Sequence, residues 1–128
     1  MPKNIYLSAA LIWTCSILFL CLASFSNLPD VGLENADKYV HFTFHFVFVN
    51  LWFLYFNYKN QINSIKLAIF IFIFSIIFGV LIELAQRVFT TTRKGDFLDV
   101  LSNATGAFSA LTILLIYIFT FKGNSKLQ

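Results

Sequence analysis

Histidine and carboxylate side chains interrupt apolar sequence at three places, and these are the residues that can do chemistry. His41 stands four residues before His45, while Glu83 and Asp99 lie within one polar stretch, residues 83–106. Residues three or four apart share a helix face, so each group is expected to line one face of its helix. A carboxylate or an imidazole at such a site can move protons. His41, Glu83 and Asp99 are therefore candidate catalytic residues.

The same residue types are also ligands for divalent metal ions. His41 and His45, one turn apart, together with Glu83 and Asp99 suit such an ion in type and number. However, the chain has no HExxH-like spacing, and nearby lysine and arginine residues compete with an ion for the carboxylates. We therefore predict no metal and no other cofactor. No serine or cysteine lies in a recognisable nucleophile motif.

A structural explanation competes with a binding or catalytic one. Glu83 and Asp99 can each pair with a nearby cation and so tie three helices together. The candidate cations are Lys38, Arg87 and Arg93. A scaffold of this kind predicts a closed and fully paired network, whereas a functional site predicts a pocket that is open to the outer leaflet.

Composition indicates that these residues lie in a lipid bilayer. Hydrophobic residues make up 59% of the 128, and only 12% are charged, whereas a soluble domain has about 25% charged residues. A crossing needs about 20 mostly apolar residues, and four stretches qualify: 5–25, 39–56, 65–89 and 97–121. Backbone groups in hydrocarbon must be hydrogen-bonded internally. We predict an all-α, polytopic bundle of four transmembrane helices, with residues 1–128 as one domain.

The second of these stretches also carries a strand-like signal. Its phenylalanines alternate strictly at Phe42, Phe44, Phe46 and Phe48, and alternation of this kind is typical of a strand. A transmembrane barrel, however, needs many alternating strands of about 9 to 11 residues, and the neighbouring segments are long apolar runs. A helix is therefore predicted here.

Lysine placement predicts the orientation of the bundle. Both ends of the chain and residues 57–66 carry lysines and no acid, so the positive-inside rule places both termini in the cytoplasm. We expect the membrane to be a bacterial inner membrane. In the orientation given by the lysines, the ionisable residues lie roughly 5 to 10 Å deep in its outer leaflet. Because the basic residues are scattered rather than clustered, no nucleic acid is expected as a partner.

Taken in order, the polar residues resemble the pattern of the VanZ-like family, named after a membrane protein associated with teicoplanin resistance. The matching motifs are DKxxHF (Asp37, Lys38, His41, Phe42), ExxQ (Glu83, Gln86), Arg93, and DxxxNxxG (Asp99, Asn103, Gly106). They cover the second to fourth predicted spans. The chain departs from the pattern at His45, where an aromatic residue is more usual, and at Ala110, which replaces a frequent second glycine.

This resemblance implies a small membrane bundle, linked in some members to glycopeptide or lipoglycopeptide resistance, without an established chemistry. It leads us to expect an outward-facing polar pocket that engages the bilayer and a lipid-linked envelope precursor or a lipoglycopeptide. The expected binding residues are Asp37, Lys38, His41, Glu83, Gln86, Arg93, Asp99 and Asn103. Two alternatives stay open. One is a membrane enzyme that acts on a lipid-linked substrate by acid/base chemistry, and the other is a structural or accessory subunit.

Single cysteines introduced at Ser26 and Asn60, in a background without Cys15 and Cys21, test the orientation. A membrane-impermeant thiol reagent added to intact cells should label position 26 and leave position 60 unlabelled, because acid-free, lysine-bearing connections stay in the cytoplasm. Labelling of position 60 alone would show the opposite orientation.

Overall fold

The computed structural model describes residues 3–23, 36–58, 63–90 and 96–122. Four α-helices fill these ranges almost completely: α1 (Lys3–Leu22), α2 (Ala36–Asn57), α3 (Ser64–Phe89) and α4 (Phe97–Tyr117). A short π-helical segment, Ile118–Lys122, extends α4. Each of the four helices is long and apolar enough to cross a membrane. The predicted fold class, an all-α bundle of four membrane-spanning helices, is confirmed.

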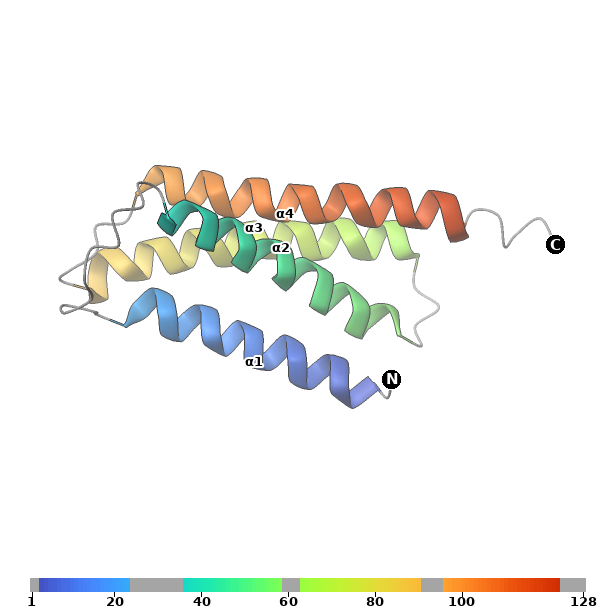
Figure 1. The fold of residues 1–128 in the computed structure, drawn as a ribbon, viewed down its shortest axis with the longest axis horizontal. Helices are drawn as coiled ribbons and strands as arrows, with labels where there is room; N and C mark the ends of the chain where they lie inside the picture. Colours follow the sequence, from blue (N-terminus) through green and yellow to red (C-terminus); the bar gives the residue numbers. More distant parts are fainter. Residues whose placement is uncertain (1–2, 24–35, 59–62, 91–95, 123–128) are drawn as a thin grey trace.

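The helices pack as neighbours of alternating direction (Figure 1). The start of α1 and the end of α4 lie at one end of the bundle, and the end of α3 and the start of α4 lie at the other. Helix α2 is central, because it packs most extensively against α4 and also contacts α1 and α3. Side chains on α2 therefore reach every other helix of the bundle.

Side-chain caps fix where two of these helices begin. Asn63 precedes α3, and its Oδ1 accepts from the main-chain nitrogens of Ile65 and Lys66. Asp96 precedes α4 and accepts from the nitrogen of Leu98 at 3.0 Å. Such caps satisfy main-chain donors that have no partner within the helix. The Asp96 cap also sets the position of Asp99, which lies in the first turn of α4.

The phenylalanines of α2 show that the alternating stretch is a helix with an inner and an outer face. Phe44 and Phe48, one turn apart, are buried in the core, while Phe42 is exposed. Large apolar side chains also cover the outside of the bundle, as at Val88 and Phe89, which are 75% and 76% exposed. A surface of this kind suits lipid rather than water.

The closest approach between helices is that of α2 and α4 at Gly106. A Cβ placed there would overlap the main-chain oxygen of Phe42 and lie 2.9 Å from its carbonyl carbon. Only glycine allows the two backbones to meet so closely, as at many interfaces between transmembrane helices. Next to this contact Ala107 and Ala110 are fully buried, so small residues continue the interface along α4.

Replacing Gly106 with alanine should separate α2 from α4, because the new methyl group meets rigid backbone rather than a movable side chain. Overpacking of this kind costs about 1 to 3 kcal/mol, so the melting temperature in detergent should fall. Thr105→Ala, at the exposed neighbouring position, is the matched control. An unchanged melting temperature for Gly106→Ala would contradict the close approach.

Candidate functional site

A cluster of polar side chains lies between α2, α3 and α4 at the end of the bundle where α2 and α4 begin. Its core consists of His41 from α2, Glu83 from α3, and Asp99 and Asn103 from α4. All four side chains are buried, with relative exposures between 2% and 8%. His41 and Asp99 lie within the first two turns of their helices and Glu83 within the last two turns of α3. We call these four residues the polar cluster.

His41 joins α2 to α4 within the polar cluster. Its Nδ1 donates to Oδ1 of Asn103 at 3.0 Å, and both groups are buried. Its Nε2 lies 3.8 Å from Oδ2 of Asp99, which is beyond hydrogen-bonding distance. Asn103 thus holds the imidazole in one orientation, with the second ring nitrogen turned toward a carboxylate.

Glu83 brings α3 to the same place. Its Oε1 accepts from the main-chain nitrogen of Asp96 at 2.7 Å, just before α4 begins. A buried carboxylate that accepts a main-chain hydrogen bond is fixed in position and ties two helices together. The sequence did not predict this contact, because it involves the backbone of Asp96 rather than its side chain.

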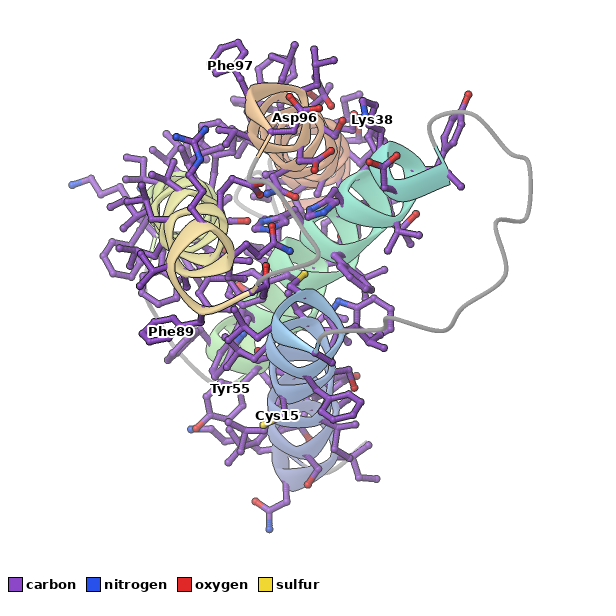
Figure 2. The ribbon with its side chains drawn as sticks, turned by 90° about the vertical axis from the view of Figure 1, so that its left-hand side faces the viewer. Cys15, Lys38, Tyr55, Phe89, Asp96 and Phe97 are labelled. Carbon is purple, nitrogen blue, oxygen red and sulfur yellow. The ribbon has the colours of Figure 1, made fainter. Side chains whose placement is uncertain are left out.

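Lys38 lies at the outer edge of the polar cluster and is the nearest cation among the residues that the structure describes. Its Nζ is 3.4 Å from Asp37, 3.6 Å from Asp96 and 3.8 Å from Asp99. Figure 2 shows Lys38 and Asp96 close together at this end of the bundle, while Phe97 and Phe89 point away from it. The ammonium group is thus shared among three acids and is paired tightly with none of them.

The polar cluster is buried, yet its hydrogen bonding is incomplete. Glu83 Oε2, Asp99 Oδ1 and Asn103 Nδ2 are inaccessible to solvent and have no hydrogen-bond partner among the described residues. An unsatisfied buried polar group costs about 1 to 3 kcal/mol, and charged groups cost more. Among the described residues, the cluster is therefore buried without being fully paired.

Three members of the cluster can offer atoms to one ligand. A ring nitrogen of His41 and one carboxylate oxygen each from Glu83 and Asp99 lie within 4.8 Å of one another. Imidazole and carboxylate groups that converge in this way can bind a polar headgroup, coordinate a cation or exchange protons with a group bound between them.

The remaining predicted site residues are placed differently. Gln86 is buried on α3, but its Nε2 donates to the main-chain oxygen of Cys21 at 2.9 Å and so attaches α1 to α3. Asp37 is exposed and contacts Lys38 at the surface. Arg93 lies outside the described residues.

A second buried polar pair lies one turn deeper than His41. Nδ1 of His45 and the hydroxyl of Ser75 are hydrogen-bonded at 2.8 Å, and both residues are buried. Gly79 adjoins both this pair and the polar cluster, since a Cβ there would lie 3.0 Å from the ring of His45 and 3.1 Å from Asn103 Nδ2. His45 is thus partnered by Ser75, apart from the three converging groups.

Ser75 was not among the predicted site residues. A signal for its role is nevertheless present on α3. Ser75, Gly79, Glu83 and Gln86 follow one another at steps of four, four and three, so they share one helix face. All four are buried, and this face meets the histidines of α2.

Comparison with known proteins yields no match, whether to a family model, to a curated protein or to a solved structure. The resemblance to the VanZ-like family therefore depends only on the motif residues between Asp37 and Gly106.

Ser75→Ala should destabilise the bundle, because it removes the hydroxyl that is hydrogen-bonded to Nδ1 of His45 and leaves that nitrogen buried without a partner. The expected cost is about 1 to 3 kcal/mol, measured as a lower melting temperature in detergent. Ser102→Ala is the matched control, since the Ser102 hydroxyl donates only to a carbonyl of its own helix. Equal melting temperatures for the two variants would contradict the pairing.

Proposed function

We propose that the chain is a VanZ-like protein of the bacterial inner membrane whose polar cluster binds the polar part of an amphiphile of the cell envelope. The amphiphile is a lipid-linked envelope precursor or a lipoglycopeptide such as teicoplanin. Both termini are cytoplasmic in this proposal, and the cluster faces the outer leaflet, where such molecules are anchored.

One observation carries the proposal: the polar cluster keeps buried donors and acceptors that no described residue satisfies. Ionisable groups within membrane spans are costly and usually mark a function. A ligand that supplies a cationic or hydroxyl group to Glu83 and an acceptor to Asn103 Nδ2 would complete the hydrogen bonding. Atoms of both kinds occur in peptide-linked and sugar-linked lipids.

The surroundings of the cluster support a route for such a ligand. Lys38, Asp37 and Asp96 are partly exposed at its outer edge, with side-chain exposures of 23%, 49% and 44%. Because Lys38 holds no acid tightly, it can turn toward a phosphate or carboxylate of the ligand. The apolar outer faces of the helices meanwhile contact lipid, where the tail of an amphiphile resides.

A second candidate function, acid/base catalysis on a lipid-linked substrate, is favoured by the orientation of His41. Asn103 fixes its Nδ1, and the free Nε2 lies 3.8 Å from Asp99. In this alternative His41, Glu83 and Asp99 exchange protons with the bound substrate. Conversion of a labelled lipid-linked precursor by the purified protein would distinguish catalysis from binding.

The test combines a resistance assay with stability measurements on Glu83→Gln, Asp99→Asn and His41→Gln. Expressed in a susceptible bacterium, the unaltered chain should raise the inhibitory concentration of teicoplanin, and each variant should reduce it to the level of the empty vector. All three variants should still accumulate and melt near the unaltered protein. Gln at position 83, for example, keeps an oxygen that can accept from the nitrogen of Asp96.

Lys66→Gln is the matched control, because it removes one exposed charge at the opposite end of α3 and leaves the polar cluster intact. It should keep both accumulation and resistance. If the three cluster variants fail to accumulate, the cluster is a scaffold, since breaking a buried ion pair costs about 3 to 5 kcal/mol. Three stable and fully active variants would show that the cluster is not the site.

A further inference from the structure

The polar cluster and its edge contain more acid than base among the described residues. Glu83 and Asp99 are buried within it, and Asp37 and Asp96 lie beside it, whereas Lys38 is the only cation in ion-pair contact with any of them in the part of the chain that the structure describes. Charges taken out of water need a counter-charge. Among the described residues, the acids of this site therefore outnumber the cations that pair with them, which favours a bound cation.

The free atoms of the cluster are arranged as metal ligands are. His41 uses Nδ1 to donate to Asn103 Oδ1, which leaves Nε2 with its lone pair. Glu83 uses Oε1 to accept from Asp96, which leaves Oε2 buried and without a partner among the residues that the structure describes. Metal-binding histidines usually donate their other ring N–H to an oxygen, and metal-binding carboxylates are likewise hydrogen-bonded through groups behind them.

The distances between the donor atoms are compatible with a zinc ion, and the ligand types favour zinc over magnesium and calcium. Donor atoms of His41, Glu83 and Asp99 lie within 4.8 Å of one another, and ligands around a tetrahedral zinc ion are about 3.3 Å apart at bond lengths near 2.0 Å. A contraction of at most about 1.5 Å, within reach of side-chain rotation, would bring the three donors to one ion. An imidazole with two carboxylates suits zinc better than magnesium or calcium, which prefer oxygen ligands alone.

We propose that His41, Glu83 and Asp99 form a binding site for one zinc ion, with Asn103 and the Asp96 main chain as positioning groups behind the ligands; this replaces the prediction from sequence that the chain binds no metal. Two carboxylates and a neutral imidazole would balance the charge of the ion. This inference deepens the proposed function by naming a cofactor for the same cluster, and its biological role rests on that function. Zinc then takes the place at Glu83 that a cationic or hydroxyl group of the amphiphile has in the proposed function, and the fourth ligand position is left for water or for an anionic oxygen of the amphiphile.

Metal content and melting temperature of the full-length protein in detergent test the zinc site. After treatment with a chelator and dialysis against Zn²⁺, the protein should retain about one zinc per chain and melt at a higher temperature, because an ion bound to the folded state stabilises it. Mg²⁺ at the same concentration should not raise the melting temperature. Glu83→Gln and Asp99→Asn should weaken zinc binding at least about 100-fold, and Asn103→Ala about 10- to 100-fold.

His45→Gln is the matched control, since His45 is a buried histidine on the same helix that is bonded to Ser75 instead. It should retain its zinc.

Lys38→Gln should change the zinc affinity in the opposite direction from the ligand variants. Its ammonium lies 3.8 Å from Asp99 and repels an ion bound there, so its removal should tighten zinc binding about tenfold. A gain in affinity cannot result from unfolding.

Three results would overturn the zinc site: no zinc retained by the unaltered chain, equal zinc retained by Glu83→Gln and Asp99→Asn, or no gain in affinity for Lys38→Gln. The two proposals can fail separately. If zinc is not retained but the cluster variants still lose resistance, the zinc site is wrong and the amphiphile site stands. If zinc is lost from the variants but their resistance is unchanged, the zinc site stands and the proposed function is wrong.

Discussion

The contact between Gly106 and the main chain of Phe42 sets the spacing on which the polar cluster depends. Because no Cβ separates them, α2 and α4 approach more closely than side chains elsewhere would allow. His41 precedes Phe42, and Asn103 lies one turn before Gly106. The same close approach therefore places the imidazole 3.0 Å from the amide oxygen. A wider separation would leave both groups buried and unpaired.

The bilayer explains why the polar residues gather at one place. Lipid-facing positions are covered by large apolar side chains, so a polar side chain within a span must find its partners between helices. His45 and Ser75 satisfy each other in this way. The polar cluster does so only in part, since Glu83 and Asn103 keep unpartnered atoms among the described residues. His45 and Ser75 thus form a satisfied pair, whereas the polar cluster keeps donors and acceptors that no described residue satisfies.

The fold was predictable from sequence to a large extent. Long apolar runs in hydrocarbon can only be helices or barrel strands, and four runs of helical length leave one choice. The predicted spans 39–56, 65–89 and 97–121 agree with α2, α3 and α4 to within a few residues. Even the alternating phenylalanines of α2 were correctly assigned to a helix, because segment length outweighs local alternation.

By itself the sequence determined the membrane class, the helices and the identity of the ionisable residues within them, since each follows from local composition and spacing. Only the tertiary structure decided which of these residues meet. His41, Glu83, Asp99 and Asn103 come together, whereas His45 pairs with Ser75 and Gln86 with the main chain of α1. Helical periodicity gives the face of one helix, but the rotation and distance between helices depend on packing at contacts such as Gly106. Spacing along the chain does not contain that information.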